Sequence, residues 1–180
     1  MDCLGPADVV AFWREVGAEK WFAKDAAFDA AFRERFLGLH MAVAARRHDD
    51  WLGSAAGALA LILLTDQFPR NAFRGTAHMY ATDPLARHHA RQALAAGHWE
   101  PLAPELRLFL CLPFTHSEDL ADQDLSVALH GRLGPPSLAH AEHHRDIVCR
   151  FGRFPHRNAM LARETTAEEA LFLAEGGFAG

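Results

Sequence analysis

The sequence predicts a single all-α domain over residues 1–180, in which about eight antiparallel helices pack as a bundle or a short solenoid of helix pairs. Three observations predict this fold class. Apolar residues recur at steps of three and four along most of the chain. The chain has no run of alternating β-branched residues and no Asn-Gly hairpin turn. Short loops separate the expected helices, and short loops make consecutive helices antiparallel.

The first third of the chain is expected to hold three helices. Pro6 opens the first, over Ala7–Glu15, and Asp25 opens a second that carries one apolar stripe. The third, Leu52–Gln67, is apolar on nearly every side, which predicts a position in the centre of the domain. Pro69 is expected to stop this helix, because proline has no N–H to donate to the helix ladder.

Each later helix is marked by a capping residue or a proline. The expected signals, in order, are Asp83 as the N-cap of a helix to Ala96, Pro104 at the start of a helix that Pro113 limits, Ser117 as the N-cap of the next, Ser137 as the N-cap of a helix to Phe151 after a Pro135-Pro136 link, and Thr166–Glu169 as the capping box of a terminal helix.

Composition and charge narrow the classes of partner. A net charge of −5 argues against a general nucleic-acid binder, which needs a basic surface. The most apolar run, Ala55–Leu64, is much shorter than the ~20 residues of a membrane span, so no membrane partner is expected. The cysteines and the N-terminus bear on location. Cys3, Cys111 and Cys149 form no CxxC pair and are interpreted as reduced thiols. No signal peptide is visible at the start of the sequence. Together these features predict a cytoplasmic protein.

Two loops carry the same unusual pattern. Asp66–Asn71 and Gly152–Asn158 each follow an apolar helix, and each contains Phe-Pro with arginine and asparagine after it. Proline ends a helix, and the phenylalanine before it can bury the corner of the chain. The sequence therefore predicts two buried corners of similar construction.

The charges of these loops need a separate explanation, because they are clustered cations in an acidic chain. The planar guanidinium group of arginine matches a carboxylate or a phosphate. We expect a cationic pocket, whose ligand-binding residues are Arg70, Asn71, Arg153, His156, Arg157 and Asn158. The alternative is that Arg70 and Arg157 bridge carboxylates of the fold, such as Asp66, or bind carbonyl groups at helix ends.

His116, Glu118 and Asp66 are the candidates for catalysis. A histidine and carboxylates could act as acid and base in a small-molecule hydrolase, with the arginines holding an anionic substrate. The alternative is structural, because Ser117 is the expected N-cap and Glu118 belongs to the acidic first turn after it.

No metal site and no cofactor are expected. His140 and His144 lie four positions apart and could chelate a metal from one helix face, but that face is also the one expected to be buried. The chain contains no HExxH motif and neither of the glycine-rich nucleotide motifs GxGxxG and GxxxxGK[ST].

Several long motifs resemble one known family. These are DQFPRNAFRGTA at Asp66–Ala77, LPFTHSEDLADQ at Leu112–Gln123 and FGRFPHRN at Phe151–Asn158. The chain resembles the DUF924 family, an uncharacterised group, through these motifs over nearly its whole length. The resemblance implies a tetratricopeptide-like all-helical fold and brings no established activity.

The sequence is therefore consistent with three functions. The first is a soluble helical binding module whose cationic pocket takes a peptide or a small anionic ligand. The second is a hydrolase that uses His116, Glu118 and Asp66. The third is a purely protein-interaction domain, in which all the motifs determine the fold.

Overall fold

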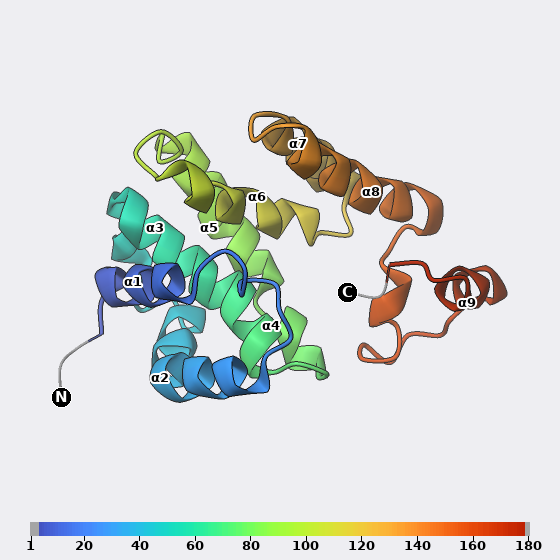
Figure 1. Ribbon diagram of the computed structural model, residues 1–180, viewed down its shortest axis with the longest axis horizontal. Coiled ribbons are helices and arrows are strands. Elements are labelled where there is room, and N and C mark those ends of the chain that lie inside the picture. Colours follow the sequence, from blue (N-terminus) through green and yellow to red (C-terminus); the bar gives the residue numbers. More distant parts are fainter. Residues whose placement is uncertain (1–3, 179–180) are drawn as a thin grey trace. The chain divides into compact units, whose positions relative to one another are not determined.

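The computed structural model describes residues 4–178, and within that range it contains helices and no strand (Figure 1). Eight of the α-helices have eight residues or more, which confirms the predicted all-α class and the expectation of about eight helices. None of the described helices is long and apolar enough to cross a membrane. The α-helices are α1 Pro6–Val16, α2 Ala26–Ala44, α3 Ala55–Ile62, α4 Phe68–Ala72, α5 Asp83–Ala95, α6 Leu108–Thr115, α7 Leu120–Gly131, α8 Pro135–Phe151 and α9 Ala167–Ala174.

Contacts within the chain divide it into two compact units. Unit 1 runs up to Arg74 and continues over His78–Pro113, and unit 2 comprises Gly75–Ala77 and the chain from Phe114 onward. The single domain predicted from the sequence stays a prediction.

Unit 1 is built around α3. Helices α1 and α5 both pack against α3, and α2 packs against α4. The central position predicted for the third helix is confirmed, because every residue of Ala58–Leu64 is buried. Aromatic side chains fill the space between α1 and α2, with Trp13 packing on Phe32 and the indole N–H of Trp21 donating to the Trp13 carbonyl at 2.8 Å.

The prediction that Pro69 ends the third helix is wrong. Instead, α3 widens into a π-helical segment over Leu63–Gln67, and α4 continues from Phe68 with Pro69 in its first turn. The N–H of Phe68 bonds to the Leu63 carbonyl, five residues back. A π-helical turn gives room for the proline ring, which in an α-helix would clash with the carbonyl four residues earlier. The chain therefore stays helical through the Phe-Pro pair.

Three predicted start signals are also wrong. Asp83 lies inside the first turn of α5, and the N-cap residue of that helix is Thr82. The carboxylate of Asp83 binds Arg70 instead of capping the helix. Asp119 is the N-cap of α7 in place of Ser117. Gly134 precedes α8, so Pro135-Pro136 forms the first turn of that helix and Ser137 is not its cap. Prolines fit the first turn because the N–H groups there have no helical partner.

Pro113 does not limit its helix either, since it lies within α6, which runs to Thr115. The capping box at Thr166 is confirmed: its hydroxyl accepts from the Glu169 N–H at 3.2 Å, and the Glu169 carboxylate accepts from the Thr166 N–H at 2.8 Å. Cys111 and Cys149 form no disulfide within residues 4–178, and Cys3 lies outside the described residues.

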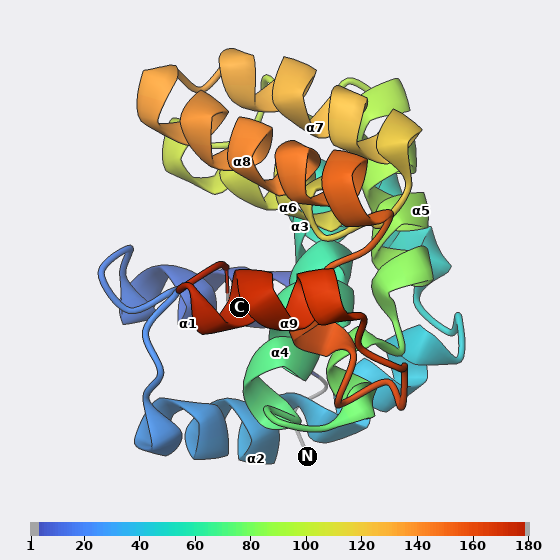
Figure 2. The same ribbon diagram turned by 90° about the vertical axis from the view of Figure 1, so that its right-hand side faces the viewer.

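Unit 2 consists of the α7–α8 hairpin and a smaller C-terminal part (Figures 1 and 2). Gly134 has a φ of 110° before α8, and Gly152 a φ of 69° after it, and both values favour glycine. After Gly152 the chain forms a 3₁₀ turn over Pro155–Arg157, which contacts α9. A small apolar core, of Ile147, Val148 and Phe154 with Phe151 and Phe172 against it, holds these parts together.

Candidate functional site

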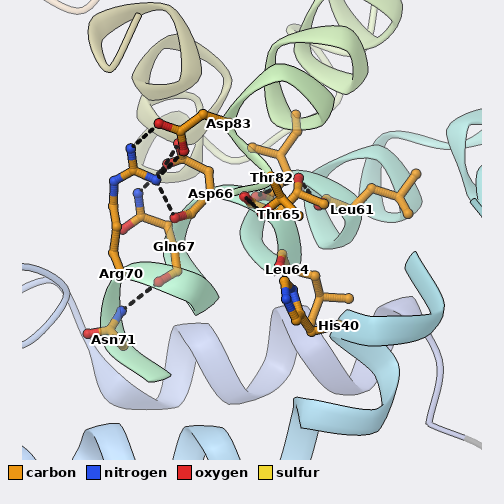
Figure 3. Close-up of polar contacts among 11 residues, drawn as sticks. His40, Leu61, Leu64, Thr65, Asp66, Gln67, Arg70, Asn71, Thr82 and Asp83 are labelled. Carbon is orange, nitrogen blue, oxygen red and sulfur yellow. Dashed lines mark hydrogen bonds and ion pairs between the residues drawn. The ribbon is translucent and has the colours of Figure 1, made fainter. Parts of the chain in front are cut away.

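The first Phe-Pro loop is a buried polar network around the π-helical segment of unit 1 (Figure 3). Its backbone carbonyls lose their usual helical donors, because Pro69 has no N–H and the Phe68 N–H is shifted to Leu63. Side chains from other elements replace those donors. His40 donates to the Leu64 carbonyl at 2.8 Å, and Thr82 donates to the Thr65 carbonyl at 2.6 Å.

Arg70 is held inside this network. Its two terminal nitrogens donate to the two oxygens of Asp83 at 2.8 and 3.0 Å, and Nη1 also lies 3.2 Å from Asp66. Burial lowers the pKa of Arg70, but Asp66 and Asp83 outweigh that effect and raise the pKa above its ordinary value. Asn71 donates to the Gln67 carbonyl at 2.9 Å. Both residues predicted to bind a ligand in this loop thus bind groups of unit 1, and of the two the structural alternative had named Arg70.

The second Phe-Pro loop is organised around Glu169 of α9. Arg153 donates to both carboxylate oxygens of Glu169, through Nε at 2.6 Å and Nη2 at 2.8 Å. Asn158 donates to the same carboxylate at 3.2 Å. The hydrogen bond from Arg153, aided by the Thr166 N–H, lowers the pKa of Glu169 to about 2 against the opposing effect of burial. Arg153 and Asn158 are therefore brought together by one carboxylate.

Arg157 and His156 lie against the aromatic core of unit 2. The guanidinium group of Arg157 sits 4.5 Å from the centre of the Phe154 ring, and the residue is 6% exposed. The ring of His156 lies 5.7 Å from that of Phe154 and 5.1 Å from that of Phe178. These two residues line the buried corner of the loop. The two Phe-Pro loops belong to different units, Asp66–Asn71 to unit 1 and Gly152–Asn158 to unit 2.

The carboxylates proposed for catalysis are both engaged. Glu118 accepts from the Phe154 N–H at 2.9 Å and from Arg163 Nη1 at 2.8 Å. Burial raises the pKa of Glu118, but these two hydrogen bonds outweigh it and lower the pKa below its ordinary value. Asp66, in unit 1, is 1% exposed and accepts from the Gln67 amide at 2.6 Å. The arrangement of Glu118 suits a permanent carboxylate anion, whereas an acid or base must exchange a proton.

His116 lies near other histidines of unit 2. Positive charge on His116 would repel charge on His130, His140 and His144. Burial is the main cause that lowers the pKa of His144, to about 3, and this ring packs on that of His140 with 4.3 Å between centres. Among residues 4–178, no three His, Cys, Asp or Glu side chains are grouped so as to hold a metal ion.

Unit 2 contains a cavity of about 510 Å³ beside the second loop, and this cavity is widely open to solvent. Its lining residues are Arg153, Arg163, Glu164 and Thr166. Arg153 follows the left-handed glycine that ends α8, and Thr166 is the N-cap of α9, so two helix ends fix these side chains. Sequence reasoning singled out Arg153 but missed Arg163. The sequence feature that could have identified Arg163 is its position three residues before Thr166, the first residue of the capping box. This position places a cation near the positive end of a helix.

The cavity is lined by hydrogen-bond donors that the described part of the chain does not use. Arg163 donates through Nη1 to Glu118, while its Nε and Nη2 make no hydrogen bond with residues 4–178. Arg153 likewise leaves Nη1 unused. The Thr166 oxygen accepts from Glu169, which leaves its hydroxyl proton available to donate. With side-chain exposures of 27% for Arg153 and 31% for Arg163, both guanidinium groups are reachable from solvent.

Comparisons with known proteins agree with the architecture. The model of the family described as "Bacterial protein of unknown function (DUF924)" matches residues 9–177. A solved structure, that of the protein of unknown function ATU0120 from Agrobacterium tumefaciens, is similar to this chain with 57% identity and a TM-score of 0.93. That similarity covers 95% of this chain and 97% of the other. No curated protein matches the sequence.

Proposed function

The chain belongs to the DUF924 family, and from its side-chain geometry we propose that it is a binding protein that holds an anionic group in the unit 2 cavity lined by Arg153, Arg163 and Thr166. The observation that carries the proposal is the set of unused donors, namely Arg153 Nη1, Arg163 Nε and Nη2, and the Thr166 hydroxyl. Charge-assisted N–H groups are strong partners for an anion.

The position of the cavity supports the same function. Thr166 is the N-cap of α9, and the N-terminus of an α-helix carries partial positive charge from its aligned peptide dipoles. The side chains are also held in place before any ligand arrives, because Arg153 is fixed by Glu169 and Arg163 by Glu118. Donors that are already ordered lose less conformational entropy when they bind.

This proposal keeps part of the ligand set expected from the sequence. Arg153 lines the cavity, and Asn158 supports it indirectly through Glu169. Arg70 and Asn71 are used inside unit 1, and the proposal does not need them. A peptide or a small anion stays the proposed partner, with the cytoplasmic location and tetratricopeptide-like geometry still predictions from the sequence.

A thermal-shift screen against anions tests the proposal. A ligand at ten times its Kd stabilises the native state by about 1.4 kcal/mol, which for a chain of this size raises Tm by about 3–6 °C. We expect such a rise with at least one of phosphate, sulfate, succinate and propionate at millimolar concentration. Arg163→Gln should abolish the rise.

The matched control is Arg145→Gln, since Arg145, like Arg163, pairs with a single carboxylate, that of the exposed Asp124, and does not line the cavity. This variant should respond to the anion as the wild type does. An equal rise in the Arg163→Gln variant, or no rise with any anion, would remove the support for this site.

A further inference from the structure

Arg163 leaves one edge of its guanidinium group unused within the described part of the chain. Only Nη1 is engaged, by Glu118 at 2.8 Å. The edge formed by Nε and Nη2 makes no hydrogen bond with residues 4–178. These two N–H groups are parallel, so a single ligand can accept from both.

The same edge binds carboxylates elsewhere in this protein. Arg153 holds the two oxygens of Glu169 through Nε and Nη2, at 2.6 and 2.8 Å. Arg74 holds the two oxygens of Asp29 through the same pair of nitrogens, at 2.8 and 3.1 Å. A carboxylate with its two oxygens in one plane fits this edge, and the edge of Arg163 has the same two donors.

The carboxylates around the cavity repel a multiply charged anion more strongly than a singly charged one. Glu164 lines the cavity, while Glu118 and Glu169 are bound to the two arginines. Three carboxylates thus lie on or next to a site with two guanidinium groups. A phosphate, which carries more than one negative charge near neutral pH, meets stronger repulsion from these carboxylates than a monoanion does.

We infer that the cavity selects a carboxylate, held by Nε and Nη2 of Arg163, over a phosphate. This inference rests on the proposed function, because it names the chemical class of the anion that the cavity binds. The carboxylate comes either from a small organic acid or from the C-terminus of a peptide, since both present the same two oxygens.

Isothermal titration calorimetry at pH 7 tests this selectivity with four probes. These are propionate, an N-acetylated alanine tripeptide with a free C-terminus, the same tripeptide as its C-terminal amide, and inorganic phosphate. We expect the free tripeptide or propionate to bind at least tenfold more tightly than phosphate, and the amide not to bind. Tighter binding of the tripeptide than of propionate assigns the carboxylate to a chain end, and equal binding assigns it to a small acid.

Arg163→Lys tests the geometry of the contact, because lysine keeps the positive charge and lacks the paired N–H groups. It should weaken carboxylate binding at least tenfold, whereas Arg145→Lys should leave it unchanged. Phosphate binding as tight as that of the carboxylates, or undiminished carboxylate binding by a folded Arg163→Lys variant, overturns the inference and leaves the proposed function standing. No binding of any probe overturns the inference, and together with no thermal shift by sulfate or succinate it overturns the proposed function as well. The wild-type comparison between probes needs no variant, so it decides the selectivity even if a variant fails to fold.

Discussion

The hydroxyl of Thr82 donates a 2.6 Å hydrogen bond to the backbone carbonyl of Thr65, the carbonyl whose α-helical donor would have been the missing N–H of Pro69. Both residues are buried, so water does not take the place of the lost donor. This contact explains how a helix in the centre of unit 1 continues through a proline.

Thr82→Val tests that contact, because it removes the hydroxyl at nearly constant volume. The buried Thr65 carbonyl would be left without its side-chain donor, which costs about 1–3 kcal/mol of unfolding free energy. Urea unfolding measures the change. Thr82→Ser retains the hydroxyl and should recover most of the stability, and a Thr82→Val variant as stable as wild type would contradict the role given to Thr82.

The buried ion pair of Arg70 and Asp83 gives a second prediction. Within residues 4–178, Asp83→Ala leaves the Arg70 charge with Asp66 as its one remaining ion-pair partner, and breaking one side of a buried pair costs about 3–5 kcal/mol. Replacing both residues, as in Arg70→Met with Asp83→Leu, should cost less than the sum of Arg70→Met and Asp83→Leu alone, because neither member of the pair is then left without the other. Asp66 loses Arg70 in the Arg70→Met single variant and in the double variant alike, so this loss does not change the comparison. Additive losses in a double-mutant cycle would show that the two side chains do not act as a pair.

Acid should destabilise the protein through buried histidines. Burial is the main cause that lowers the pKa of His144 to about 3 and of His89 to about 4, while the unfolded chain keeps a value near 6.5. The unfolded state therefore takes up protons first. The contribution of these two histidines to the free energy of unfolding is complete above pH 6.5. It is lost as the pH drops from there towards 3–4, by up to ~1.4 kcal/mol per pH unit for each histidine.

His144→Gln checks the part of this slope that belongs to His144. Urea unfolding at several pH values should show a smaller loss of stability between pH 6.5 and 4 in the variant than in the wild type. The comparison uses the slope and not the absolute stability, because the substitution also changes packing against His140 and Phe154. Identical slopes would mean that His144 does not titrate as described.

Thr166 is both the N-cap of α9 and a lining residue of the cavity, so its substitution should change both stability and anion binding. Thr166→Ala removes the hydroxyl that accepts from the Glu169 N–H, at a cost of about 1 kcal/mol, and it also removes one donor from the cavity. Hydrogen exchange should quicken in α9, and anion binding should weaken. Thr166→Ser should preserve both properties. Unchanged exchange in Thr166→Ala would contradict the role of Thr166 as the cap.

Local signals in the sequence predicted much of this fold. Periodicity identified the buried third helix, and the Thr166–Glu169 spacing identified a capping box, because both depend on residues close together in the chain. The path through Pro69 could not be predicted in that way. It depends on His40 and Thr82, which reach the π-helical carbonyls from distant positions.

The candidate site was predicted only in part for the same reason. The structural alternative named Asp66 as a partner of Arg70 and named no partner for Arg153. The two-pronged partners of Arg70 and Arg153 are Asp83 and Glu169, which lie 13 and 16 residues away. Such distant carboxylates decide whether the N–H groups of an arginine are occupied within the protein. Arg163 was missed because nothing next to it in the sequence shows that Glu118 takes only one of its nitrogens.

The Nε–H resonance of Arg163, followed in a ¹⁵N–¹H spectrum during titration with the free-acid tripeptide, tests the central claim most directly. The account predicts a saturable shift of this resonance, with the Nε–H resonance of Arg145 unchanged as an internal control, because Arg145 already donates through Nε to Asp124. A resonance of Arg163 that stays in place at saturating tripeptide and at saturating phosphate would contradict anion binding at this cavity.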